Sequence, residues 1–423
     1  MSQLQNSSTR KIALSNPTRT RASSPTLSGR PPSTRRTGKA CPTRVGFKIF
    51  DFPLSLQFCN CLMCFFKVYI SIFAKKVYIF ALFLQIHYQK TMGWEILVVI
   101  ILLGLAFDYT NGFHDAANVV STVIATRVLA PATAIILAAL LNFLGATQIS
   151  GVAQTIASGL VEATQTSQIT VLCALIGAIF WNLMTWYLGI PSSSSYALVG
   201  GLVGAAWVQV GWKVVLWQGV LYKVIIPMVL SPIAGFLLGL LLMKLLHRLL
   251  QMRFLKRHPD LFNHLQVASA SLMALSHGFN DAQKSMGIIT LGLFAAGVIT
   301  VPHIPLWVIA SCALMMGLGT ASGGFRIIRT VGYGITHLKP VQGFAAETGA
   351  SCVILTAGLL GMPVSSTHMI VGSVTGVGSA KGTKNVRWGI MKKLVLAWII
   401  TLPGAGIVAA LAYYCSTLLG VAT

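Results

Sequence analysis

Two aspartates stand in nearly the same local sequence at two places far apart along the chain. Asp115 lies in NGFHDAANVV and Asp281 in HGFNDAQKSM. Both stretches have apolar surroundings, where an ionisable side chain is costly and is by default a functional residue. A carboxylate there can coordinate Na⁺ through its oxygens or carry a proton. The amides of Asn118 and Asn280 supply further oxygens, so each motif is a candidate cation site.

Other titratable side chains lie close to these motifs or within apolar segments. His114 precedes the first aspartate and belongs to the residue type that titrates near neutral pH. His368 and Glu347 lie in the second half of the chain, in VSSTHMIVG and GFAAETGA. We consider all three for a proton, metal or pathway role. Each could instead cap a helix or make an interhelical hydrogen bond.

A second repeated element combines proline with serines. GIPSSSSYALVGGLVG starts at Gly189, and GMPVSSTHMIVGSVTG starts at Gly361. Irregular backbone survives within a bilayer only where protein or a water-filled cavity surrounds it. We therefore expect Pro191 and Pro363 to start two half-helices, whose first hydroxyls and N–H groups face a cavity. Such N-termini bind anions, which indicates a small oxyanion as the ligand. Simple capping of kinked helices is the alternative.

The composition around these elements is that of a polytopic helical membrane protein. Of the 423 residues, 55% are hydrophobic and 9% are charged, and the mean hydropathy is +0.76. Several apolar stretches approach the roughly 20 residues that cross a bilayer. The expected fold class is all-α, with about 10–12 transmembrane segments that include broken helices or re-entrant hairpins. Such a chain is expected in the cell membrane as a multi-pass protein.

The formal net charge of +23 does not indicate a nucleic-acid partner. Much of the excess lies in the first 91 residues, and the rest falls mainly in short basic clusters between apolar segments, at 244–258, 326–331 and 381–393. Short basic loops are typical of the cytoplasmic side of a membrane protein. Four of the eight cysteines lie in the first 91 residues and the other four are scattered in apolar segments, so no disulfide framework is implied.

The chain divides at a basic amphipathic stretch. We expect a first transmembrane repeat over residues 92–246, a cytoplasmic linker at the membrane surface over 247–264, and a second repeat over 265–423. The aspartate motif and the proline-serine element recur in the same order and at nearly equal spacing, which indicates an internal duplication. Residues 1–91 are a basic extension, expected to be disordered at first and apolar afterwards. Met92 is the expected physiological start.

Together these motifs resemble those of the inorganic phosphate transporter family, of the bacterial low-affinity permease type. GFHDAAN and GFNDAQK are similar to its duplicated Gly-x-Asn-Asp signature. PSSSSYALVGGLVGA and PVSSTHMIVGSVTGVG are similar to its paired Pro-x-Ser-Ser-x-His elements. The resemblance covers about residues 92–423. It implies two inverted-topology repeats that carry inorganic phosphate by cation-coupled symport with alternating access.

The resemblance also implies roles for particular residues. It assigns cation coupling to Asp115, Asn118, Asn280 and Asp281, and phosphate binding to Ser193, Ser194, Ser365, Ser366 and Thr367. His114 replaces the asparagine that is usual in sodium-coupled members. It is more similar to proton-coupled bacterial members, some of which carry a metal–phosphate complex. The coupling cation is therefore H⁺ or Na⁺, and no other cofactor is expected.

Several alternatives stay open at this point. Serine hydroxyls and N–H groups also bind sulfate, so a sulfate permease of the same fold is the nearest alternative. An intramembrane serine hydrolase would pair Ser366 with His368, but their spacing faces them apart on a helix, so an enzyme is not expected. An uncoupled anion channel is the third. With the lipid bilayer as surroundings, the assembly could be a monomer or a homodimer.

Overall fold

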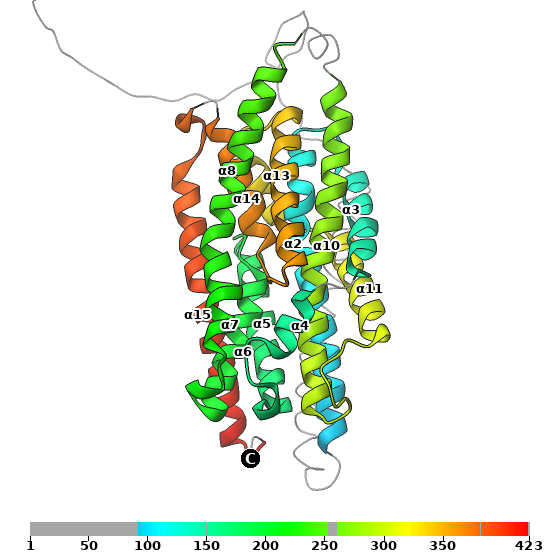
Figure 1. Cartoon of the computed structure of the whole chain (residues 1–423), viewed down its shortest axis with the longest axis vertical. Coiled ribbons are helices and arrows are strands. Elements are labelled where there is room, and N and C mark those ends of the chain that lie inside the picture. Colours follow the sequence, from blue (N-terminus) through cyan, green and yellow to red (C-terminus); the bar gives the residue numbers. More distant parts are fainter. Residues whose placement is uncertain (1–91, 149–150, 253–259, 381, 422–423) are drawn as a thin grey trace, which may run out of the picture. The chain divides into compact units, whose positions relative to one another are not determined.

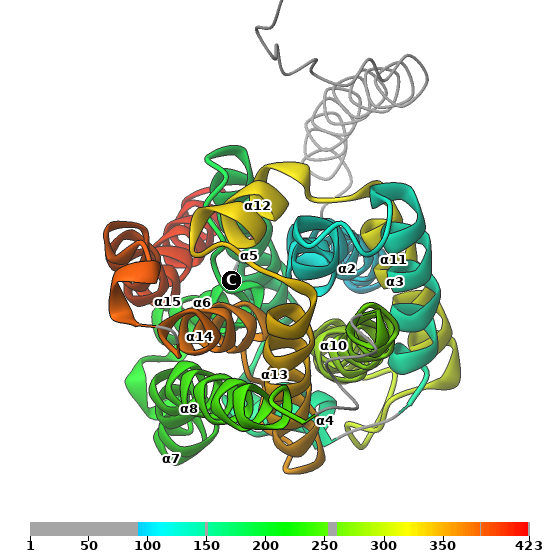
Figure 2. The same cartoon turned by 90° about the horizontal axis from the view of Figure 1, so that it is seen from above.

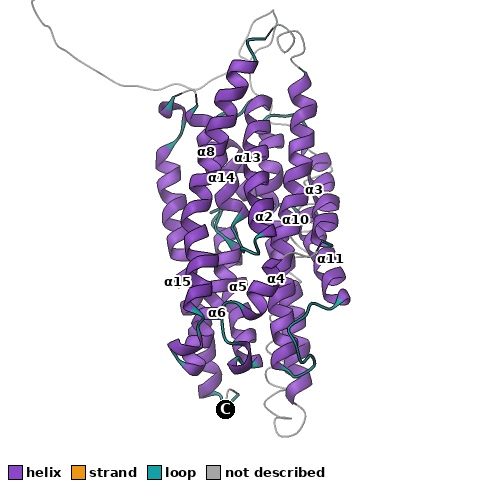
Figure 3. Cartoon of the chain, viewed as in Figure 1, coloured by secondary structure: helices purple, strands orange, loops and turns teal. Residues whose placement is uncertain are grey.

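The computed structural model of the chain describes residues 92–148, 151–252, 260–380 and 382–421, and almost all of them are helical (Figure 1, Figure 3). No strand occurs within these ranges, and an isolated bridge joins Val161 and Val215. The expected all-α class is confirmed. What we predicted for residues 1–91 lies outside the described residues.

The two halves of the chain contain helices in the same order. The first half comprises α2 (Met92–Ala125), α3 (Pro131–Ala146), α4 (Gly151–Ser158), α5 (Gln168–Tyr187), α6 (Ser194–Val210), α7 (Trp217–Val220) and α8 (Ile226–Leu249). The second half comprises α10 (Leu261–Ala295), α11 (Leu306–Ser322), α12 (Phe325–Arg329), α13 (Pro340–Leu359), α14 (Ser366–Ser379) and α15 (Trp388–Leu418). The ends of the predicted linker 247–264 belong to α8 and α10, and residues 253–259 are outside the described ranges.

Corresponding helices of the two halves run in opposite directions. In Figure 1, α2 rises from its blue end at the bottom, whereas α10 starts at the top and descends. In the same view α6 runs downward from the middle of the bundle and α14 runs upward from it. From above, α2, α10, α13 and α14 lie between α8 and α15 on one side and α3 and α11 on the other (Figure 2).

The halves exchange packing partners in matching pairs. Helix α6 packs against α15 of the other half, and α14 packs against α8. Likewise α2 packs against α11, and α10 against α3. Nearly all of α14 and the first three turns of α6 are buried. A helix that is apolar and buried all round belongs to the centre of a large bundle, so these two helices form the core.

Glycines make the closest of these approaches possible. A Cβ at Gly200 of α6 would lie 2.1 Å from the carbonyl oxygen of Leu402, and one at Gly372 of α14 would lie 2.4 Å from that of Pro232. The two glycines hold equivalent places in the repeated serine elements. Small residues at helix interfaces let backbones meet closely in membrane proteins, and here they do so symmetrically.

Among the described residues, four helical stretches are long and apolar enough to cross a membrane: Gly93–Ala125, Gln168–Tyr187, Trp217–Leu249 and Trp388–Leu418. The number reaches six if each of two bent helix pairs counts as one span; α11 and the segment Phe325–Gly334 form one such pair, bent by 60°. These broken helices agree with the expected architecture. The total of about ten to twelve segments stays a prediction.

Enlarging the contact glycines should destabilise the fold. We expect Gly200→Ala and Gly372→Ala each to cost about 1–3 kcal/mol, because the added methyl group must displace a facing backbone. Gly389→Ala is the matched control, since nothing lies within 4 Å of a Cβ at Gly389. Thermal unfolding in detergent measures the difference. Equal midpoints for all three variants would contradict this account of the helix contacts.

Candidate functional site

The two serine loops share one backbone geometry. Each follows a helix, α5 or α13, and each turns at a glycine with φ of +67°, Gly189 in the first loop and Gly361 in the second. Glycine adopts this left-handed region at no steric cost. The chain then runs without regular structure to Ser194, where α6 begins, and to Ser366, where α14 begins. The two elements that the sequence repeats are therefore also repeated in conformation.

The predicted place of the prolines at the helix starts is wrong. Ser193 and Ser365 are the N-caps, and each side-chain oxygen accepts a hydrogen bond of 3.3 Å from a first-turn N–H, of Tyr196 and His368 respectively. Serine takes this position because its oxygen satisfies an otherwise free N–H, which proline cannot do. Both prolines lie two residues ahead of the caps, in the segment that leads into each helix.

Asp115 of α2 receives hydrogen bonds from the first turns of α6 and α14. The hydroxyl of Ser194 donates to its Oδ2 at 2.9 Å, and that of Thr367 donates to its Oδ1 at 3.4 Å. Nδ1 of His114 lies 2.7 Å from the same Oδ1. The carboxylate is 2% exposed. The chain thus brings residues from α2, α6 and α14 to one buried charge.

Asp281 of α10 has a similar setting with a different composition. Ser366 donates to its Oδ2 at 3.2 Å. Nζ of Lys284 lies 2.8 Å from Oδ1, and Nε2 of His277 lies 3.5 Å from Oδ2. All four side chains are buried. Because Ser366 and Thr367 are adjacent, α14 contacts both aspartates.

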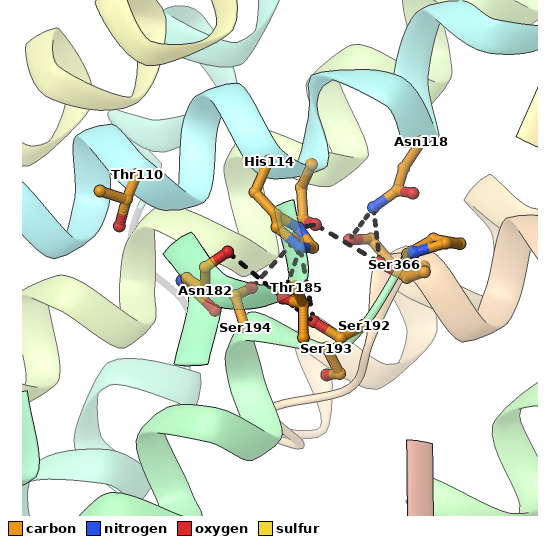
Figure 4. A network of polar contacts seen from close by, with 12 residues as sticks. Thr110, His114, Asn118, Asn182, Thr185, Ser192, Ser193, Ser194 and Ser366 are labelled. Carbon is orange, nitrogen blue, oxygen red and sulfur yellow. Dashed lines mark hydrogen bonds and ion pairs between the residues drawn. The ribbon is translucent and has the colours of Figure 1, made fainter. Parts of the chain in front are cut away.

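The two asparagines of the motifs lie at the same centre. The amide of Asn118 donates to Thr367 at 2.8 Å and to Ser366 at 3.3 Å (Figure 4). The amide of Asn280 donates to the carbonyl oxygen of Met362 at 3.4 Å. The side-chain oxygens of both asparagines are buried and have no hydrogen-bond partner within the described part of the chain. These oxygens are free to coordinate a cation.

Sequence reasoning missed several polar neighbours of His114. Its Nε2 lies 3.3 Å from the hydroxyl of Thr185 and 3.4 Å from that of Ser192, and Ser192 donates to Thr185 at 2.8 Å (Figure 4). Asn182 is buried in the same network, as Figure 4 shows. Asn182 and Thr185 are three residues apart in an otherwise apolar helix, and that spacing on one helix face was the available signal.

His277 was also missed, although it lies inside the second aspartate motif. Atoms of Asp115, His277 and Asp281 that could bind a metal all lie within 4.8 Å of one another. Nδ1 of His277 is 3.1 Å from Oδ1 of Asn142, which orients the ring. Two carboxylates and one imidazole suit a hard or borderline cation, so the group is chemically competent to hold one.

Glu347 of α13 lies in a separate buried cluster of polar side chains. The hydroxyl of Thr122 donates to it at 2.5 Å, the amide of Gln266 donates at 3.2 Å, and Ser269 donates to its other oxygen. Thr122 is one helical turn beyond Asn118 on α2. The side chain of Glu347 therefore lies one turn further along α2 than Asn118, and the described side chains that hydrogen-bond to it are Thr122, Gln266 and Ser269.

His368 packs against aromatic rings and not against Ser366. Its ring stacks on Trp398 with a centroid distance of 4.0 Å and lies 5.1 Å from the ring of Tyr196. Nε1 of Trp398 donates to the carbonyl oxygen of Pro191 at 3.1 Å. The hydroxyl of Ser366 is engaged with Asp281 and Asn118. The nucleophile–base pair that a serine hydrolase requires is not formed between Ser366 and His368.

These observations define the class of the protein: a multi-pass helical membrane protein with a buried centre of polar and charged side chains. The model of the phosphate transporter family matches residues 111–409, and the chain belongs to that family. The family match and the apolar helices together make the chain a multi-pass protein of the plasma membrane. The family prediction is confirmed.

Individual relatives agree with the family match. The chain is 47% identical to a probable low-affinity inorganic phosphate transporter of Mycobacterium bovis over 320 residues, which is 75% of this chain and 77% of the relative. It is 41% identical to a protein of the same name from Bacillus subtilis, with 75% of this chain and 96% of that protein covered. These relatives are named as transporters, which agrees with the prediction that the chain is not an enzyme.

One solved structure is also similar. It is described as the sodium-dependent phosphate transporter, with a TM-score of 0.69 and 26% sequence identity. The match covers 76% of this chain and 99% of that one. The arrangement of helices described above is therefore one that a known phosphate transporter also adopts.

The capping role of the loop serines can be separated from other roles. We expect Ser193→Ala and Ser365→Ala each to lose about 1 kcal/mol of stability, whereas glycine at either position should lose only a few tenths, because glycine leaves the first N–H groups open to other partners. Thermal unfolding in detergent measures both. Wild-type stability in both alanine variants would show that the cap bond is not what the serine contributes.

Proposed function

We propose that this chain is a secondary active transporter of inorganic phosphate that couples phosphate movement to a cation. The proposal rests on one observation: Asp115 and Asp281 share a site. Hydroxyls from the first residues of the oppositely directed helices α6 and α14 donate hydrogen bonds to these two carboxylates. Membership of the phosphate transporter family and the names of the relatives support phosphate as the substrate.

The anion would bind at the N-termini of α6 and α14. Each helix directs free first-turn N–H groups and partial positive charge toward the centre. The hydroxyls of Ser194, Ser366 and Thr367 are donors at these helix starts. Ser193 and Ser365 use an oxygen lone pair for capping, which leaves each hydroxyl hydrogen available as a further donor.

The cation would bind at the carboxylates and amide oxygens beside them. Asp115, Asp281, Asn118 and Asn280 supply oxygen ligands, and neutralising the carboxylates releases the serine hydroxyls to the anion. The solved relative is described as sodium-dependent, which supports Na⁺. The contact of His114 with Asp115 supports a proton carried at this pair. The cluster of Asp115, His277 and Asp281 would suit a divalent metal that travels with phosphate.

The transport movement would be a motion of one half against the other. The opposite directions of α2 and α10 and of α6 and α14, together with the matched packing pairs, support two inverted-topology repeats over about residues 92–246 and 265–423. The central side chains are at most 2% exposed, as an occluded state requires. Alternating access then exposes the shared site to one side of the membrane at a time. Glu347 would lie along the same route.

Phosphate is favoured over sulfate by the acceptors at the site. Monohydrogen phosphate can donate its proton in a hydrogen bond to a carboxylate, whereas sulfate at neutral pH has no proton and would face the carboxylate oxygens without a hydrogen bond. A site built to accept a ligand's hydrogen bond rejects an analogue that lacks it. Asp115 and Asp281 both lie beside the serine donors, so either can be that acceptor.

Uptake of labelled phosphate and labelled sulfate into proteoliposomes tests the proposal. Na⁺ and pH gradients are imposed separately, so that the driving ion is identified in the same assay. We expect concentrative phosphate uptake under one of these gradients and little competition by sulfate. Equal handling of both anions, or phosphate entry that never exceeds equilibration, would overturn phosphate symport in favour of the sulfate or the channel alternative.

Neutralising either central aspartate should abolish accumulation. We expect Asp115→Asn and Asp281→Asn to lose concentrative phosphate uptake, because the coupling cation loses a charged ligand. Asp260→Asn is the matched control, since Asp260 is an exposed acid just before α10 and should transport normally. The uptake assay above measures all three. Accumulation at the wild-type level in both central variants would contradict the cation role.

Removing two donors should weaken phosphate binding. We expect Ser194→Ala combined with Ser366→Ala to raise the Km for phosphate at least about tenfold, because each hydrogen bond to a charged group is worth about 1.5–3 kcal/mol. The control is Ser311→Ala combined with Ser416→Ala, since both of those hydroxyls bond carbonyl groups of their own helices. An unchanged Km in the first pair would remove the anion assignment.

A further inference from the structure

Among the positions at which the two aspartate motifs differ, one carries a fixed charge at the site. Three residues after the aspartate, the first motif has Asn118 and the second has Lys284. Lys284 is fully buried, and its Nζ lies 2.8 Å from Oδ1 of Asp281. Beyond that ion pair the ammonium group has no hydrogen-bond partner among the residues that the structure describes. A buried cation in a membrane helix is costly and indicates a function.

The ion pair does not fasten separate parts of the fold together. Lys284 and Asp281 both belong to α10 and lie one turn apart. The bond that ties Asp281 to another helix comes from Ser366 of α14. What the lysine adds here is therefore a positive charge that stays with the chain through the transport cycle.

The first motif has no permanent charge of this kind. Asn118 is neutral and donates to Ser366 and Thr367. Asp115 has the ring of His114 as its nitrogen partner, and an imidazole is a cation only when protonated. Of the described side chains that contact the two aspartates, Lys284 is the one that carries a fixed positive charge.

We propose that Lys284 is a resident cation that replaces one mobile coupling cation, so that the mobile cation binds in the Asp115 half of the site alone. This inference rests on the phosphate transport proposed above. It changes the role of Asp281, which pairs with Lys284 and is no longer a ligand of the mobile cation. With the lysine present, the two aspartates leave one negative charge uncompensated; without it they leave two. Uncompensated charge is expensive to bury, so an anion arriving beside two bare carboxylates would require a further cation.

The test measures the number of cations moved with each phosphate. The full chain is reconstituted in proteoliposomes, and the membrane potential at which labelled phosphate shows no net flux gives the cation-to-phosphate ratio. We expect Lys284→Asn, which installs the residue of the first motif, to move one more cation per phosphate than the wild type. Its uptake should be lower at limiting cation and should recover at saturating cation.

Two further variants separate charge from structure. Lys284→Arg keeps the positive charge and should keep the wild-type ratio. Lys284→Gln removes the charge but keeps more of the side-chain length than asparagine, so it should raise the ratio as Lys284→Asn does. If Lys284→Asn alone does not fold, Lys284→Gln decides between the interpretations, because a lysine that only bound phosphate would leave it with a raised Km and the wild-type ratio.

The outcomes are distinct. A wild-type ratio in active Lys284→Asn or Lys284→Gln vesicles would overturn the inference, as would a changed ratio in Lys284→Arg. Wild-type vesicles that accumulate no phosphate under either gradient would overturn the proposed function itself, and that result is read before any variant is compared. Phosphate uptake by the wild type with the ratio unchanged in Lys284→Asn would leave the transporter proposal standing and remove only the resident cation.

Discussion

A carboxylate buried in a membrane protein needs hydrogen-bond donors or a positive charge beside it, because its surroundings offer neither water nor lipid headgroups. Two such carboxylates, Asp115 and Asp281, set the requirements for the rest of this fold. Their donors are hydroxyls at the starts of two broken helices, Ser194 of α6 and Ser366 of α14. The glycine turns and the close contacts at Gly200 and Gly372 bring those helix starts to the carboxylates.

The duplicated arrangement is not symmetric in its chemistry. Helix α14 donates to both aspartates, through Ser366 and Thr367, whereas Ser194 of α6 donates to Asp115. The partners also differ: an imidazole lies beside Asp115 and an ammonium group beside Asp281. A similar backbone thus holds two unequal charge environments, and the proposed division between a mobile and a resident cation rests on this inequality.

The sequence predicted the parts of the site whose signal is local. The repeated aspartate motifs and serine elements came directly from composition in an apolar background, and the structure brings them together. It did not predict that serines rather than prolines cap α6 and α14, because both residue types favour helix starts and only the backbone path decides between them. Thr185 and His277 were missed although each had a local signal: Thr185 shares a helix face with Asn182, and His277 is one turn before Asp281. Spacing did not reveal that tertiary packing brings Thr185 to His114. The number of membrane spans depends on where bent helices end, and no local pattern fixes that.

The indole of Trp398 donates to the backbone of the first serine loop, at Pro191, and stacks on His368, which follows the second loop. One side chain from the last helix therefore supports both loops at once. After an ancestral gene was doubled, such a bridge would end the independence of the two copies. From then on, changes in the first loop would be judged by natural selection against a ring encoded in the second copy, so the first half could no longer diverge independently of the second.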